Sequence, residues 1–94
     1  MLHEKIKEIR EVREKEALEA EGEEVKSTWI NPWSGPSVAK RLSIARTTYY
    51  NFEKGISKLN FVQFLAVLDL FELAYVKGEL IPYEMVHIEE EIKI

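Results

Sequence analysis

The sequence has 94 residues, a net charge of −4 and no cysteine. This predicts one small domain, residues 1–94, with neither a disulfide framework nor a thiolate metal site. No apolar run approaches the length of a membrane span, and the first residues do not resemble a signal peptide. We therefore expect a cytoplasmic protein without a membrane partner.

The charges are distributed unevenly along the chain. Residues 34–60 carry five basic side chains and one acidic side chain. By contrast, residues 1–33 carry six basic and nine acidic side chains, and residues 61–94 carry two basic and seven acidic ones. A basic stretch inside an acidic chain is typical of a surface that faces DNA. The acidic flanks are expected to weaken nonspecific binding to phosphate.

A long N-terminal helix is predicted first, over residues 2–21. This stretch is rich in Glu, Lys and Arg and contains neither Gly nor Pro, a composition that favours helix. Leu2, Ile6 and Ile9 form an apolar stripe that fades after Val12, so we expect the second half of the helix to be solvated. Pairing as a coiled coil is an alternative, but the apolar repeat covers too few heptads.

Residues 22–33 form the connection that follows this helix. Residues 25–30 are predicted as a short strand or an extended loop, and Asn31-Pro32 predicts a turn. Trp33 is expected to pack in the core, as buried aromatic side chains usually do. In an alternative interpretation, three polar side chains of the connection reach a DNA backbone: Lys26, Ser27 and Thr28.

The first of two short helices begins after Ser34. A Ser side chain can accept a hydrogen bond from the free amides of a first helical turn, and Pro36 fits in that turn because no N–H is needed there. Val38, Ala39 and Leu42 then fall on one face. The small side chain of Ala39 suits the close crossing of two helices over a short turn.

The second short helix is predicted over residues 46–53. Tyr49 and Phe52 point inward, and Gly55 ends the helix as a left-handed cap. The opposite face carries four side chains that can reach a nucleic acid: Arg46, Thr47, Tyr50 and Asn51. Arg can bind guanine with two hydrogen bonds, Asn can bind adenine, and Thr can contact a base edge or a thymine methyl group.

The motif A-x-x-L-x-I-x-R-T-T-Y-Y-N-F-E-K-G, residues 39–55, resembles the helix-turn-helix of the Cro and phage-repressor (XRE-like) family of transcriptional regulators. The resemblance covers about residues 6–13 and 34–73. It implies a mainly α fold, a small lambda-repressor-like helical bundle, with residues 34–70 as helix-turn-helix and core helix. It also implies binding to double-stranded DNA as a small dimeric repressor or an antitoxin-type autoregulator, with a toxin as a possible protein partner.

The resemblance, together with the helical face, assigns roles to individual side chains. The residues expected to read bases are Ala45, Arg46, Thr47, Tyr50 and Asn51. Those expected to hold the DNA backbone are Ser34, Gly35, Lys40, Arg41, Lys54, Ser57 and Lys58. The resemblance also implies a structural ion pair between Arg10 of the first helix and Glu53.

The sequence departs from the family pattern at three positions. Ser43 stands where the turn usually has Gly, so a left-handed backbone there carries a steric cost. Ala45 replaces the usual Ser or Thr cap of the recognition helix. Gly35 stands where the family often has a Gln that contacts DNA.

After Asn60, which is expected to act as a cap, a helix is predicted over residues 61–70. Its core face is expected to comprise Phe61, Phe64, Leu65, Val67 and Leu68, packed against the helix-turn-helix. From residue 71 the apolar period changes to two, which predicts a short β-like C-terminal segment, residues 71–94, with a turn at Lys77-Gly78.

This C-terminal segment is also the expected dimerisation surface. Its alternating apolar side chains are too many for a core of its own: Leu73, Tyr75, Val86, Ile88, Ile92 and Ile94. The alternative is a hairpin that folds back on its own domain.

The sequence contains no convincing site of another kind. His3 and His87 lack partners at metal-ligand spacing, and no phosphate-binding loop or nucleophile motif occurs, so we expect no metal, no cofactor and no enzyme activity. The competing hypothesis for function is a protein-interaction module that keeps the helix-turn-helix fold without binding DNA.

Overall fold

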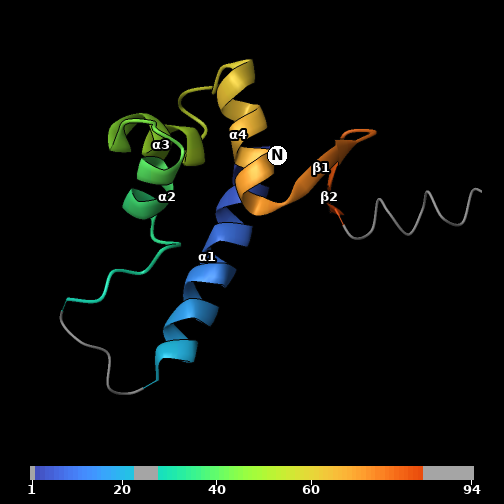
Figure 1. Ribbon diagram of the computed structural model, residues 1–94. Helices are drawn as coiled ribbons and strands as arrows, with labels where there is room; N and C mark the ends of the chain where they lie inside the picture. Colours follow the sequence, from blue (N-terminus) through green and yellow to red (C-terminus); the bar gives the residue numbers. More distant parts are fainter. Residues whose placement is uncertain (1, 23–27, 84–94) are drawn as a thin grey trace, which may run out of the picture. The chain divides into compact units, whose positions relative to one another are not determined.

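The computed structural model describes residues 2–22 and 28–83 of the chain. This part contains four helices and two strands: α1 (Leu2–Glu21), α2 (Gly35–Arg41), α3 (Arg46–Glu53), α4 (Phe61–Phe71), β1 (Leu73–Val76) and β2 (Glu79–Pro82) (Figure 1). The predicted mainly α fold with a short β segment is therefore confirmed. The chain divides into two compact units, Met1–Leu59 and Asn60–Ile94, and each is described by itself.

The first half of α1 is the part that packs, and its second half extends away from α2 and α3 (Figure 1). Ile6 and Arg10, one turn apart, are its two buried residues. Val12 and Leu18 are 52% and 50% exposed, as expected for a helix whose apolar stripe fades. The helix ends at Gly22, whose φ of +78° is a conformation that glycine adopts without steric cost.

Helices α2 and α3 form the predicted helix-turn-helix pair. The Ser34 hydroxyl accepts a hydrogen bond from the Ser37 amide, and Ala39 is only 1% exposed. Ser43 has a φ of +57°, so the turn does require a left-handed residue although it lacks the usual glycine. Ala45 is the N-cap of α3 and offers no side-chain hydrogen bond, as its sequence position implies.

The prediction that Trp33 packs in the apolar core is wrong. The side chain is half-buried, and the guanidinium groups of Arg13 and Arg41 lie over its ring, 4.8 Å and 4.6 Å from the centroid. These are cation–π distances, so the ring is held by charged groups. The Trp33 amide donates to Asn31 Oδ1 at 2.9 Å, which forms the turn expected at this position.

The same region ties the connection to both neighbouring helices. Asn31 Nδ2 donates to the Glu14 carbonyl of α1 at 2.9 Å, and Arg41 of α2 donates to the Pro32 carbonyl at 3.1 Å. Thr28, Trp29 and Ile30 form no strand. The rest of the segment for which a strand or loop is predicted lies outside the described residues.

In the second unit, α4 begins at a capping box. Asn60 accepts from the Gln63 amide at 2.8 Å, and the Gln63 side chain accepts from the Asn60 amide at 3.0 Å. The buried residues of α4 are Val67, Leu68 and Phe71. The expected core positions of Phe61 and Leu65 are wrong, because these side chains are 73% and 46% exposed and lie off the buried face.

Strands β1 and β2 form an antiparallel hairpin that follows α4 directly. Helix α4 runs one residue beyond its predicted end, and Glu72 then takes a left-handed φ of +54° to start β1. Lys77 and Gly78, with φ values of +51° and +82°, make the expected turn, because two left-handed residues match the twist of a hairpin. The register pairs Ala74 with Ile81.

Candidate nucleic-acid interface

Helix α3 has one buried face and one open face. Tyr49, Phe52 and Glu53 are buried, whereas Arg46 and Thr47 are exposed and Tyr50 is 58% exposed. This division follows from the contacts of α3 with α1 and α2, which cover only one side of an eight-residue helix. The open side holds three of the five side chains predicted to read bases.

The other two predicted base-reading residues lie at the ends of this face. Ala45 is exposed at the N-cap of α3. Asn51 is half-buried, and its carbonyl accepts hydrogen bonds from the amides of Ile56 and Ser57 at 2.9 Å and 3.2 Å. The Asn51 carbonyl therefore helps to fix the course of the chain directly after α3, in addition to any contact that the side chain makes.

The seven residues predicted to hold the DNA backbone comprise four basic residues and three small ones. Lys40 and Lys58 are exposed and make no ion pair with another described residue. Arg41 contacts the Pro32 carbonyl and the Trp33 ring. Lys54 Nζ lies 4.3 Å from the centroid of the Tyr50 ring, and hydrogen bonding to Lys54, together with its charge, lowers the pKa of Tyr50.

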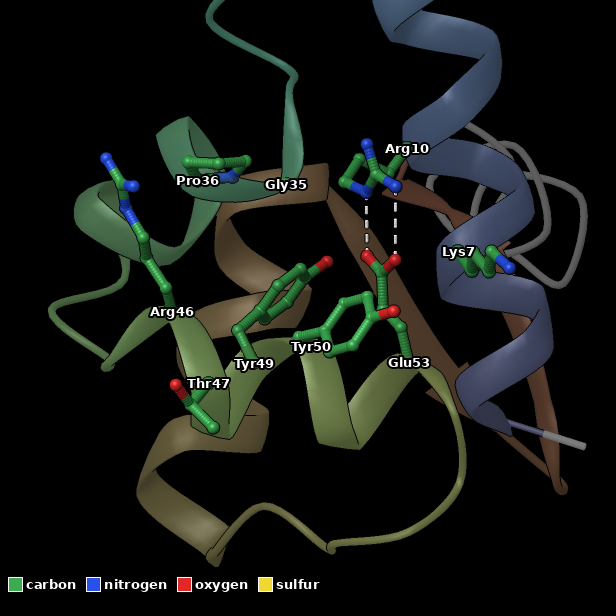
Figure 2. Close-up of a pocket in the computed structure, with 9 residues that line it drawn as sticks. All are labelled: Lys7, Arg10, Gly35, Pro36, Arg46, Thr47, Tyr49, Tyr50 and Glu53. Atoms are coloured by element: carbon green, nitrogen blue, oxygen red, sulfur yellow. Dashed lines mark hydrogen bonds and ion pairs between the residues drawn. The ribbon is translucent and has the colours of Figure 1, made fainter.

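The three small residues among these seven are Ser34, Gly35 and Ser57. The Ser34 hydroxyl also donates to Ser37 Oγ at 2.9 Å, so it is occupied at both its donor and an acceptor position. Gly35 and Ser57 are half-buried. Of these, Gly35 lies at the start of α2 beside the open face of α3, in the wall of a hollow (Figure 2).

This hollow, of about 440 Å³, lies beside the open face of α3 and is here called the α3 hollow. Its walls come from three elements (Figure 2). Helix α1 contributes Lys7 and Arg10, and α2 contributes Gly35 and Pro36. The remaining lining residues belong to α3: Arg46, Thr47, Tyr49, Tyr50 and Glu53. Three basic groups and one acidic group therefore surround it.

The ion pair implied between Arg10 and Glu53 is present in the wall of the hollow (Figure 2). Arg10 Nε donates to Glu53 Oε2 at 2.7 Å, and Nη2 donates to Oε1 at 3.1 Å. The side chains are only 10% and 7% exposed. Burial lowers the pKa of Arg10, but the hydrogen bonds and charge of Glu53 outweigh that effect and raise it overall.

Arg10 also connects the pair to the connection before α2. Its Nη1 donates to the Trp33 carbonyl at 3.1 Å and to Glu14 Oε1 at 3.3 Å. One guanidinium thus joins α1, α3 and the residue preceding Ser34. The bidentate geometry explains why Arg, and not Lys, suits this position.

Tyr49 reaches the α3 hollow from the buried side of α3. Its side chain is 1% exposed, and its buried hydroxyl group makes no hydrogen bond of ordinary length but points toward the Glu53 carboxylate (Figure 2). Burial raises the pKa of Tyr49, and the nearby Glu53 carboxylate raises it further. The phenol therefore stays protonated and remains a hydrogen-bond donor at neutral pH.

Sequence reasoning missed two residues of this site. Lys7 was not considered, although it lies three residues before Arg10 and so on the same side of α1. Tyr49 was expected only to fill the core. The helical spacing of Lys7 and Arg10 was the available signal, whereas the direction of a buried hydroxyl group cannot be read from a sequence.

The residues predicted for dimerisation are only partly described. Leu73 is 4% exposed, so it offers little surface to a partner, whereas Tyr75 is 51% exposed. The Tyr75 ring packs edge-on against Phe64, with 5.8 Å between the ring centroids. Val86, Ile88, Ile92 and Ile94 lie outside the described residues.

Within residues 2–22 and 28–83, no cluster of three or more His, Asp or Glu side chains is arranged to hold a metal ion. No helix in this part of the chain is long and apolar enough to cross a membrane.

The chain matches no protein-family model, no curated protein and no solved structure in the comparisons with known proteins. The assignment of a function therefore depends on the chain's own residues and their arrangement.

Proposed function

We propose that this protein is a sequence-specific, DNA-binding transcriptional regulator of the Cro and phage-repressor type, acting in the cytoplasm as a small repressor or antitoxin-type autoregulator. The observation that carries the proposal is the open face of α3, where Arg46, Thr47 and Tyr50 are exposed together. These side chains stand in the basic part of an acidic chain. A short helix of this kind can enter the major groove and present donors to base edges.

The proposal is distinguished from a protein-interaction module by the response to salt. Contacts between basic side chains and phosphates release counterions, so affinity for random duplex DNA falls steeply as salt increases. A titration across a salt series is therefore the first experiment. Selection of bound duplexes from a random library then gives the operator, against which the variants below are measured.

The Arg46→Ala substitution is expected to weaken binding to the selected operator by about 1–3 kcal/mol and to relax the preference at one base pair. Lys58→Ala is expected to weaken binding to all duplexes alike and to reduce the salt slope by about one unit. Fluorescence anisotropy on the operator and on its single-base variants measures both effects.

Lys15→Ala is the matched control, because Lys15 is an exposed basic residue of α1 that does not line the α3 hollow. If Arg46→Ala leaves both affinity and base preference unchanged, α3 does not read DNA through Arg46. If Lys15→Ala weakens binding as much as Lys58→Ala, the effect reflects net charge alone.

We further expect the full chain to be a homodimer, since one recognition helix reads too few base pairs for a unique site. Two such helices about 34 Å apart would then match a palindromic operator. Sedimentation velocity at micromolar concentration should give twice the chain mass of 11.0 kDa. A species that stays at the monomer mass, free and on a half-site, would contradict this expectation.

A further inference from the structure

Lys54 directly follows α3, and its side chain turns back onto the open face of that helix. Its Nζ atom lies 4.3 Å from the centroid of the Tyr50 ring, which is a cation–π distance. Tyr50 precedes Lys54 by four residues, the spacing at which side chains meet on one face of a helix. Lys54 therefore contacts one of the side chains proposed to read bases.

This contact distinguishes Lys54 from the other lysines of the basic stretch. Lys40 and Lys58 are exposed and make neither an ion pair nor a ring contact with another described residue. The family resemblance implies the same role for all three lysines, which is to hold the DNA backbone. Only Lys54, however, has an aromatic neighbour on the open face of α3.

The neighbouring lysines also act on the Tyr50 hydroxyl. Hydrogen bonding to Lys54, together with its charge, lowers the pKa of Tyr50, and the charge of Lys7 on α1 lowers it further. A phenol with a lowered pKa is a stronger hydrogen-bond donor. Tyr50 is 58% exposed, so its hydroxyl group stays accessible to a nucleic acid. Lys54 thus restrains the ring and prepares the hydroxyl to donate.

We propose that Lys54 is a positioning residue for Tyr50, and that the two side chains read one base pair as a unit. The ammonium group restrains the exposed ring before DNA is bound, so less conformational freedom is lost in the complex. The Tyr50 hydroxyl then donates to an acceptor on a base edge, such as O6 or N7 of guanine. This role rests on the proposed function and replaces the backbone contact that the resemblance implies for Lys54.

The alternative is that Lys54 leaves the ring and pairs with a DNA phosphate when the complex forms. Removing the charge would then weaken binding to all duplexes alike and reduce the salt slope by about 0.9. Removing a positioning residue instead changes the preference at the base pair that Tyr50 contacts. The two roles therefore differ in which duplexes lose affinity.

The first test compares Lys54→Met and Lys54→Arg on the selected operator and its single-base variants, by fluorescence anisotropy. Lys54→Met removes the cation and is expected to reduce the preference at one base pair by roughly two- to tenfold, the usual range for one hydrogen bond. Lys54→Arg should retain that preference, because arginine also lies over aromatic rings.

Lys58→Met is the matched control, since it removes a lysine that has no ring contact, and it should weaken binding to all duplexes alike. If Lys54→Met behaves in the same way, the positioning role is overturned. It is also overturned if Lys54→Arg loses the base preference as fully as Lys54→Met does.

A double-mutant cycle with Tyr50→Phe shows whether the two residues act together. Tyr50→Phe removes only the hydroxyl and should reduce the preference at the same base pair. Once this hydroxyl is absent, Lys54→Met should have little further effect on that preference. Losses at two different base pairs, or losses that simply add, contradict the proposal.

The contact itself is measured without DNA, so that it is tested separately from the proposed function. In a pH titration of the Tyr50 ring followed by NMR, the midpoint should lie at a lower pH in the wild type than in Lys54→Met, and Lys15→Met should not change it. Equal midpoints in the wild type and a folded Lys54→Met overturn the contact. If the midpoint shifts but no duplex is bound, the proposed function is wrong, and base reading by this pair is wrong with it.

Discussion

Glu53→Gln is expected to lower the free energy of unfolding by up to about 3–5 kcal/mol, the usual result of breaking a buried ion pair from one side. The carboxylate accepts two hydrogen bonds from Arg10, and both side chains are at least nine-tenths buried. Glutamine keeps the shape but not the charge, so the guanidinium is left without its counter-ion in a site of low dielectric. Urea denaturation at neutral pH measures the loss.

Glu14→Gln provides the matched control for this result. Glu14 also contacts Arg10, at 3.3 Å, but its side chain is 38% exposed. An exposed pair one helical turn apart contributes only about 0.3–0.5 kcal/mol. Equal losses for the two variants would contradict the structural role of the Glu53 pair. Replacing both Arg10 and Glu53 by Met should recover much of the stability, because no charge is then left unpaired.

Ile6→Ala is expected to destabilise the protein by about 2–5 kcal/mol, which is typical of removing a large buried aliphatic side chain. Ile6 is 0% exposed, and it lies on the part of α1 that also carries Lys7 and Arg10. The cavity left by the substitution weakens the attachment of α1, and with it one wall of the α3 hollow. Urea denaturation gives the size of the effect.

Val12→Ala is the control at an exposed position of α1. Val12 is on the same helix but 52% exposed, so the change should stay within about 0.5 kcal/mol. A large effect at Val12 together with a small one at Ile6 would show that α1 packs through a different face.

Local chemistry made the helix-turn-helix predictable in detail. The cap at Ser34 and the proline in the first turn define where α2 begins, and the glycine at position 55 defines where α3 ends. The structure has both boundaries where expected. The left-handed backbone at Ser43 was anticipated from the family resemblance, because Gly usually stands at this position of the turn. The Arg10–Glu53 pair came from the family resemblance and could not have come from spacing.

Features that depend on tertiary packing were not predictable. Helix α4 is almost entirely apolar, so its period does not identify one buried face, and Phe61 and Leu65 were assigned to the wrong side. Trp33 was placed in the core because it is an aromatic residue at a position where the family has an apolar one, whereas two arginines from different helices lie over its ring. The α3 hollow depends on how α1 lies against α3, which no local pattern specifies.

The contacts of Asn31, Pro32 and Trp33 also have a consequence for how this fold can change in evolution. They attach the end of the connection to α1 and to α2, so the position of α2 does not depend on the chain that leads from Gly22 to Thr28. Lengthening that chain then alters mainly the entropy of closing a loop, at about 0.6 kcal/mol for each doubling. Insertions and deletions should accumulate there, while the spacing from Asn31 to Gly55 stays constant.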